Sequence, residues 1–201
     1  MNVVFDLGGV VFNWKPYELI KKIFKDKNNQ KKANSKILHH RDWAKLDRGA
    51  INKDDAVKRA VIRTGLPAKK IDELFDTVPS SLTPIMETVD LIYKVKQFNN
   101  KVFVLSNMPF STIEYLETKN TFWDIFDGKI ISCRVQLVKP ELKIYRYLLN
   151  EYGLKPDESI FIDDTEINLK PASTIGMKTI LFKNPRQCEK QLDIYGVFDN
   201  S

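Results

Sequence analysis

The stretch that decides the fold is Val3-Val4-Phe5-Asp6-Leu7-Gly8-Gly9-Val10-Val11-Phe12. Its first three residues are apolar and favour a β-strand that is buried on both faces, as in a parallel sheet. Asp6 follows at the C-terminal end of this strand, and two glycines then allow the backbone to bend or to approach a ligand closely. Open α/β sheets bind ligands outside the carboxyl ends of their strands, so Asp6 is a candidate functional residue. An aspartate after a strand is also a common turn residue, and Asp6 alone does not decide the function.

Helical and strand-like segments alternate from residue 83 onward. Thr83-Pro84 is a typical helix start, because a capping side chain precedes a proline at the first helical position. Strands are expected at 101–105, 129–133, 159–162 and 179–182, with helices between them at about 112–117, from Lys139-Pro140 through Tyr152, and at 166–174. This alternation predicts an α/β protein with a Rossmann-like parallel sheet and helices on both faces.

Residues 16–82 contain no segment that favours a strand. Apolar residues at helical spacing predict helices at about 17–24, 39–46, 52–64 and 68–75, whereas the polar residues 26–34 favour a lysine-rich loop. The sequence therefore predicts a small helical bundle at 16–82, inserted into an α/β core domain made of residues 1–15 and 83–201.

The composition is that of an ordinary globular protein with a basic excess. The chain of 201 residues has 32 Lys and Arg against 26 Asp and Glu, a net charge of +6. This balance favours anionic partners such as phosphorylated metabolites. Nucleic acid is not an expected partner, because no basic motif with interleaved aromatic residues is present.

The sequence shows no pattern of a membrane helix or signal peptide, and it has two cysteines. No apolar run reaches the ~18 residues that a membrane helix needs, and no basic region precedes the apolar N-terminal stretch as in a signal peptide. Cys133 and Cys188 lie far apart without metal-ligand spacing, so we expect reduced, structural cysteines. These features predict a cytoplasmic protein without a membrane partner, and they say nothing of its oligomeric state.

Polar residues follow four elements of the predicted core in a fixed order. They are Asp6, Ser106-Asn107, Lys139-Pro140 and Asp163-Asp164. Each has an ordinary explanation as a turn residue, a surface lysine or a helix cap. Together, at the same end of a parallel sheet, they are expected to converge on one crevice.

This order of motifs resembles the haloacid dehalogenase-like hydrolase superfamily over nearly the whole chain. The four family motifs match Val3–Val10, Val104–Asn107, Val138–Pro140 and Phe161–Asn168. The segment from Trp43 to Ile51 is similar to part of the helical cap of the capped phosphatase subfamily. The most similar branch is the glucose-1-phosphate phosphatase-like one, whose first motif has the same Asp-Leu-Gly-x-Val pattern.

The resemblance implies a Mg²⁺-dependent phosphatase of small phosphorylated metabolites, with sugar phosphates as one substrate class. Asp6 would attack phosphorus, and Lys139 would neutralise both this nucleophile and the transferring group. Ser106, Asn107 and Lys139 would bind the phosphoryl oxygens, and Asn168 would brace the fourth motif. The resemblance assigns the metal to Asp6, the backbone carbonyl of Gly8, Asp164 and Asp163, an all-oxygen set that suits Mg²⁺.

One position departs from the pattern of most phosphatases in this superfamily. They carry a second aspartate two residues after the nucleophile as general acid and base, and this chain has Gly8 there. Loss of a positioned acid or base commonly costs about 10²–10⁴-fold in rate. Three explanations stay open: a cap residue or water replaces it, turnover is slow, or substrates have good leaving groups. The most similar branch shares this glycine.

Two other functions are weighed against the phosphatase. A metal-independent 2-haloacid dehalogenase would use Asp6 on carbon, but the paired acids Asp163 and Asp164 suit a hard cation. A catalytically inert binding module is supported by Gly8 and opposed by the retained Asp6, Lys139 and acid pair.

The sequence does not identify which residues of the predicted cap contact the substrate. The candidates are His39, His40, Arg41 and Trp43. Trp14 and Trp123 are expected to be packing residues.

Overall fold

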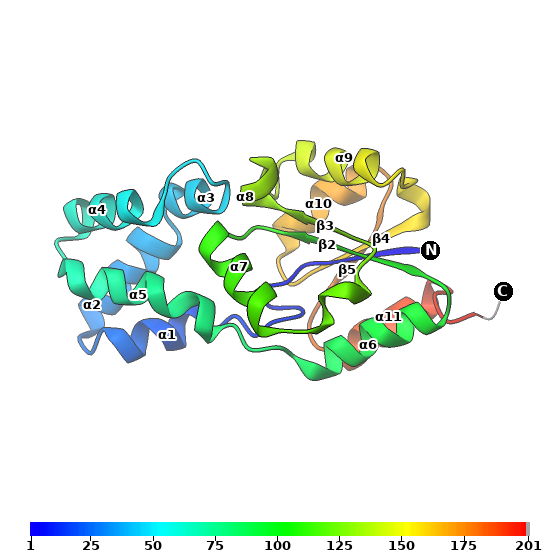
Figure 1. Ribbon diagram of the computed structural model, residues 1–201, viewed down its shortest axis with the longest axis horizontal. Helices are drawn as coiled ribbons and strands as arrows, with labels where there is room; N and C mark the ends of the chain where they lie inside the picture. The colour runs from blue at the N-terminus through cyan, green and yellow to red at the C-terminus, as the bar shows by residue number, and fades with distance from the viewer. Residues whose placement is uncertain (200–201) are drawn as a thin grey trace.

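The computed structural model describes residues 1–199 and is built on a parallel sheet with the strand order β3-β2-β1-β4-β5 (Figure 1). Every neighbouring pair of strands is parallel, which confirms the predicted Rossmann-like α/β fold. The stretch that contains Asp6 supplies β1, the central strand. The strands are β1 (Asn2–Phe5), β2 (Lys101–Ser106), β3 (Gly128–Ile131), β4 (Ser159–Asp163) and β5 (Lys178–Leu181).

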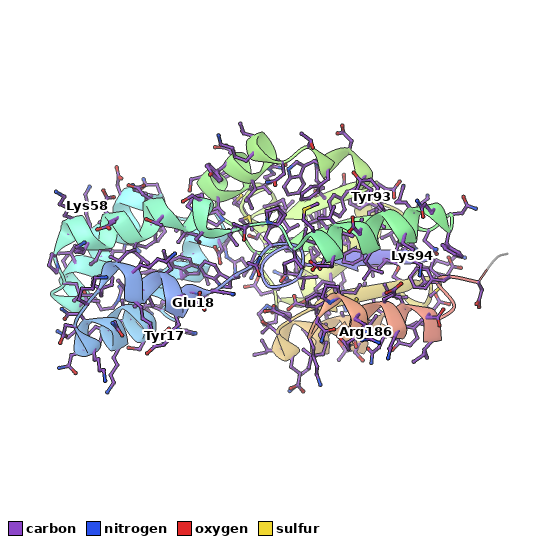
Figure 2. The ribbon with its side chains drawn as sticks, turned by 90° about the horizontal axis from the view of Figure 1, so that it is seen from below. Tyr17, Glu18, Lys58, Tyr93, Lys94 and Arg186 are labelled. Carbon is purple, nitrogen blue, oxygen red and sulfur yellow. The ribbon has the colours of Figure 1, made fainter. Side chains whose placement is uncertain are left out.

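Helices cover both faces of this sheet, and consecutive strand residues point to opposite faces. Val3 and Phe5 pack toward one group of helices, while Val4 packs toward the other. The first group is α6 (Met86–Gln97), α7 (Phe110–Lys119) and α11 (Pro185–Ile194), and the second is α9 (Leu142–Glu151) and α10 (Glu166–Thr174). Figure 2 shows α6 and α11 side by side, where Lys94 of α6 pairs with Glu189 of α11 at 2.6 Å. Shorter helical turns are η2 (Phe122–Ile125), α8 (Ser132–Val135) and η3 (Pro156–Glu158).

Residues 16–82 form a group of helices, here called the helical unit, next to the carboxyl ends of the strands (Figure 1). Its elements are α1 (Pro16–Ile23), α2 (Lys27–Ala33), the π-helix η1 (Asn34–Leu38), α3 (Arg41–Asp47), α4 (Lys53–Thr64) and α5 (Ala68–Ser81). Ile20, Ile71 and Leu74 are fully buried inside it. This apolar interior joins the helices to one another and continues into the core of the sheet domain.

Several predicted bounds were wrong: α5 runs to Ser81 rather than to about residue 75, and α9 begins at Leu142 rather than at Lys139-Pro140. Specific hydrogen bonds explain three further differences. Residues 27–33 form α2 rather than a loop, since the side chain of Asp26 caps the backbone N–H of Asn29. α6 begins at Met86 rather than at Thr83-Pro84, because the backbone from Thr83 to Ile85 pairs with residues 11–13 instead. β3 ends at Ile131 rather than at Cys133, where the Ser132 hydroxyl bonds to other loops and α8 begins.

The state of the two cysteines and the character of the helices can also be compared with the sequence. Cys133 and Cys188 are both buried free thiols. Of the helices within residues 1–199, none combines the length and the apolar character that crossing a bilayer requires.

Tyr145 joins α9 to α10, and removal of its hydroxyl group tests how strongly this contact stabilises the fold. Its ring is fully buried and its hydroxyl donates to the Asn168 carbonyl at 2.6 Å. We expect Tyr145→Phe to lower the free energy of unfolding by about 1 kcal/mol, because a partly buried hydrogen bond is lost and the Asn168 carbonyl loses its donor. Urea unfolding would measure this. Tyr147→Phe, on the same helix but 38% exposed, is the matched control and should leave stability unchanged. Equal stability of the two variants would contradict the prediction.

Candidate active site

Three strands bring their C-terminal polar residues together. Asp6 directly follows β1, Ser106 ends β2 and Asp163 ends β4. Since β1 lies between β2 and β4, these three positions are neighbours at one end of the sheet. Lys139 reaches the same place from the loop before α9.

A cavity of about 190 Å³ opens at this point, between the strand ends and the helical unit. Asp163 lies behind the cavity wall, fully buried. The structure thus brings all of the predicted site residues together. Those that line the cavity are Asp6, Gly8, Ser106, Asn107, Lys139, Asp164 and Asn168.

The Lys139 ammonium group is the centre of the site. It lies 2.8 Å from Asp6 Oδ1 and 2.6 Å from Asp163 Oδ2, and its side chain is 1% exposed. Burial alone would lower the pKa of Lys139, but the two carboxylates raise it above its usual value, so the group stays charged. Burial raises the pKa of Asp6 to about 7, while Lys139 and the Ser106 hydroxyl oppose that shift. Lys139 therefore favours the ionised form of Asp6.

The two consecutive aspartates of the fourth motif have different surroundings. Asp163 accepts hydrogen bonds from the backbone N–H of Thr165 at 2.8 Å and from Asn168 Nδ2 at 3.1 Å on both oxygens. Lys139 also contacts Asp163, so both Asp163 oxygens are occupied by protein groups. Asp164 is exposed and its only side-chain partner among residues 1–199 is the neighbouring Thr165 hydroxyl, so it can meet a ligand.

Three carboxylates stand close enough to share a cation. Asp6, Asp163 and Asp164 each offer one oxygen within 4.8 Å of the others. Carboxylate oxygens are the ligands that hard divalent cations such as Mg²⁺ prefer. Although Asp164 is exposed to the cavity, the protein atoms around it displace part of its hydration; this desolvation, and then the charge of Asp163, raise the pKa of Asp164. The donor set present here fits Mg²⁺.

Asn107 has a partner that the sequence did not indicate. Its Nδ2 donates to the Lys139 carbonyl at 2.9 Å, and its Oδ1 accepts from the Lys139 N–H at 2.8 Å. These two bonds fasten the loop after β2 to the loop that carries Lys139. Because Nδ2 carries two hydrogens, one of them is left for a ligand in the cavity.

The two glycines after Asp6 are not equivalent. Gly9 has φ +79°, and a Cβ added there would lie 2.2 Å from Asp164 Oδ2, so this position requires glycine. A Cβ added at Gly8 would meet only the Trp14 Cβ, at 3.9 Å. Space for a Cβ atom therefore exists at Gly8.

Part of the cavity lining is apolar, and we call this part the apolar wall. Trp14 and Trp43 stack with their ring centroids 6.3 Å apart, and Trp43 stacks in turn on Phe75 at 5.4 Å. Trp14 therefore packs, as expected, but it also faces the cavity. The wall consists of Trp14, Trp43, Val78, Leu82, Met108 and Pro109.

The family model for haloacid dehalogenase-like hydrolases matches residues 3–182 of this chain. The chain belongs to this family. It is therefore a hydrolase, as the resemblance of the four motifs implied.

Individual relatives agree with this membership. A sesquiterpene phosphatase, astK, of Aspergillus oryzae is 29% identical over 174 residues, which cover 87% of this chain and 85% of that protein. Drimenol cyclase drtB of Aspergillus calidoustus is 27% identical over 198 residues. The match covers 96% of this chain but only 36% of the cyclase. A HAD family enzyme of Bacteroides thetaiotaomicron, crystallised with magnesium and inorganic phosphate, superimposes with a TM-score of 0.70 at 26% identity, covering 90% of the hydrolase and 93% of that chain.

The sequence missed one ionisable residue of the site, Asp47. It ends α3 and lines the cavity with Asp6 and Lys139. Its side chain is buried, and within residues 1–199 no group donates a hydrogen bond to its carboxylate. Burial raises the pKa of Asp47 to about 7; the charge of Lys139 opposes this shift and that of Asp6 adds to it. In the sequence, Asp47-Arg48-Gly49 has the pattern of an ordinary helix end, so only the fold identifies this aspartate.

The other candidates from the helical unit have different positions. Of the four, only Trp43 lines the cavity. His40 caps α3 by accepting from the Asp42 N–H at 3.1 Å, and His39 bonds to the Asn34 carbonyl at 2.9 Å. The two histidines thus serve local helix structure, and Arg41 lies beside them on the outer surface.

Asp47→Asn is expected to stabilise the hydrolase at pH 8. The pKa of Asp47 rises from its ordinary value of 3.8 to about 7 in the folded state. Between pH 4 and pH 7, the folded protein therefore keeps a proton on Asp47 that the unfolded chain has released. The stability present below pH 4 is lost as the pH rises to 7, by on the order of 2–4 kcal/mol. Asparagine carries no such charge and avoids this loss.

Urea unfolding in EDTA would measure the effect at pH 4 and at pH 8. The difference in free energy of unfolding between Asp47→Asn and the natural protein should be small at pH 4 and largest at pH 8. Asp54→Asn, an exposed aspartate in the same helical unit, is the control and should show no such growth. A gain that is independent of pH would argue against a buried, unpaired Asp47.

Proposed function

We propose that this hydrolase is a Mg²⁺-dependent phosphatase of small phosphorylated metabolites, with Asp6 as its nucleophile. The observation that carries the proposal is the Lys139 ammonium group, which joins Asp6 at 2.8 Å to the buried Asp163. Phosphoryl transfer depends on positioning and on charge neutralisation more than on bond chemistry supplied by the protein. A fixed cation next to a carboxylate meets both needs.

The reaction proceeds in two displacements. An oxygen of Asp6 attacks phosphorus and the bond to the leaving oxygen breaks, which leaves an aspartyl-phosphate. Water then attacks phosphorus and releases Asp6. Lys139, the Ser106 hydroxyl and the remaining amide hydrogen of Asn107 hold the phosphoryl oxygens and spread their charge in both steps.

We further propose that the three carboxylates have different roles. Asp6, the Gly8 carbonyl and Asp164 would hold Mg²⁺, which supplies further neutralisation of the phosphoryl charge when it is bound. Asp163 has its oxygens engaged by Lys139, Asn168 and the Thr165 N–H, so its part is to hold Lys139 and the fourth motif in place. Asn168 braces Asp163 in this arrangement.

The helical unit would act as the cap, with residues 1–15 and 83–201 as the core domain. It supplies Trp43, Asp47, Val78 and Leu82 to a cavity whose floor belongs to the core. Closure of such a unit over the site excludes water from the reaction. A cytoplasmic location, expected from the sequence, stays a prediction.

The lining of the cavity favours one class of leaving group. The apolar wall has few donors or acceptors for the hydroxyl groups of a sugar, whereas it suits a hydrocarbon chain. The similarity to a sesquiterpene phosphatase supports the same choice. We therefore propose monophosphate esters of apolar alcohols as substrates, in preference to the sugar phosphates that the sequence suggested.

The central prediction is hydrolysis of an activated aryl phosphate, such as 4-nitrophenyl phosphate, in the presence of Mg²⁺. EDTA should abolish turnover, and Asp6→Asn should lower kcat by about 10⁴-fold or more, because removal of a nucleophile commonly costs that much. Asp54→Asn should keep full activity.

Three other outcomes would contradict this proposal. Turnover by Asp6→Asn equal to that of the natural protein would exclude Asp6 as nucleophile. Release of halide from 2-chloropropionate without metal would favour the dehalogenase. Binding of a phosphate analogue without turnover of any ester would favour an inert binding module.

The substrate class is tested by comparing kcat/KM for a prenyl-type monophosphate with kcat/KM for a hexose phosphate. We expect the apolar ester to be preferred by at least about 10-fold, the scale of a few methylene contacts. Trp43→Ala should remove most of this preference and leave the hexose phosphate nearly unaffected. A preference for the hexose phosphate would overturn the assignment of the apolar wall.

A further inference from the structure

The proposed phosphatase lacks a proton donor and acceptor where its first motif would place one. An alcohol leaving from phosphorus needs a proton, and the water that attacks the aspartyl-phosphate must lose one. Gly8 cannot serve, although a Cβ atom would fit there with only the Trp14 Cβ nearby, at 3.9 Å. A carboxyl group from elsewhere in the cavity could take both roles.

Asp47 is in the right place for this task. It lines the same cavity as Asp6 and Lys139, and it comes from the helical unit rather than from the strand ends. It is not among the three carboxylates whose oxygens lie within 4.8 Å of one another. Asp47 is thus separate from the cation position, and it lies one helical turn after Trp43 of the apolar wall.

Asp47 is also free of the contacts that explain other buried acids here. Asp42, on the same helix, pairs with Arg63 at 2.8 Å and with His40 at 3.4 Å. Asp163 is held by Lys139 and Asn168. By contrast, the hydrogen bonds and ion pairs of residues 1–199 include none on the Asp47 carboxylate. A buried carboxyl group without a partner destabilises a fold, and such groups concentrate at functional sites.

The backbone at Asp47 is nevertheless firmly placed. The Ser132 hydroxyl donates to the Asp47 carbonyl at 2.5 Å. The next residue, Arg48, forms an ion pair with Glu141 and donates to the Gln136 carbonyl at 3.0 Å. Gln136 and Glu141 flank Lys139 in one loop, so the same contacts fix Asp47 relative to Lys139.

We propose that Asp47 is the general acid and base of this hydrolase, in place of the residue missing at Gly8; the inference rests on the proposed phosphatase function. Asp47 gives its proton to the leaving oxygen as the bond between phosphorus and that oxygen breaks, so the alcohol departs neutral. Its carboxylate then takes a proton from the water that attacks phosphorus. The bond between Asp6 and phosphorus breaks, and inorganic phosphate and both original aspartates result. A pKa of about 7 lets one carboxyl group do both at neutral pH.

The test is the dependence of Asp47→Asn on the leaving group, measured on the full chain with Mg²⁺. For butyl phosphate, whose alkoxide needs a proton, kcat/KM should fall by about 10²–10⁴-fold. For 4-nitrophenyl phosphate, whose phenolate leaves without one, kcat/KM should fall by less than about 10-fold, while the aspartyl-phosphate accumulates as a burst because its hydrolysis lacks a base. Asp54→Asn should leave both rates unchanged.

The outcomes separate this inference from the function on which it rests. Equal losses on both esters, or no loss on either, overturn the role of Asp47 and leave the phosphatase intact. Absence of turnover by the natural protein on both esters overturns the proposed function and the inference together. Thermal unfolding of the Asp47→Asn protein shows that the loss is not one of folding, because the neutral variant should be at least as stable as the natural protein.

Discussion

The structure of the site depends on a buried ammonium group, that of Lys139, held between Asp6 and Asp163. A buried charge is tolerated only when it is paired and hydrogen-bonded, so the lysine requires both carboxylates in place. Much of the local hydrogen bonding maintains this arrangement. Asn107 holds the backbone of Lys139, and Asn168 holds Asp163. The loops after three strands and the loop before α9 are thereby tied to one point.

The parallel sheet explains why these loops can meet. Every strand runs in the same direction, so all of the C-terminal polar residues appear at one end. The helical unit then closes that end and adds what the strands lack, an apolar wall and the Asp47 carboxyl group. Arg48 and Ser132 connect the two parts beside the cavity. The site is complete only where the sheet and the helical unit meet.

Sequence patterns predicted the fold well wherever local periodicity and burial agree. Short apolar runs identified the central strands, because strands buried on both faces leave no polar alternation. Boundaries were less predictable, since they depend on tertiary hydrogen bonds: Thr83 looks like a helix cap but pairs with Asn13. The charged helix at 27–33 was missed because it has few apolar residues and relies on the cap that Asp26 provides.

The sequence by itself determined the α/β class, the family and the residues at the strand ends, because these are encoded in contiguous motifs that adopt one local geometry. Only the tertiary structure decided which of those residues contact one another. It showed that Asp163 faces Lys139 while Asp164 faces solvent, a distinction between neighbours that no spacing predicts. It also placed Asp47 in the same cavity as the strand ends, although 41 positions (47 − 6) separate it from Asp6 in the chain. Burial and charge act through space, and the order of residues along the chain does not contain those distances.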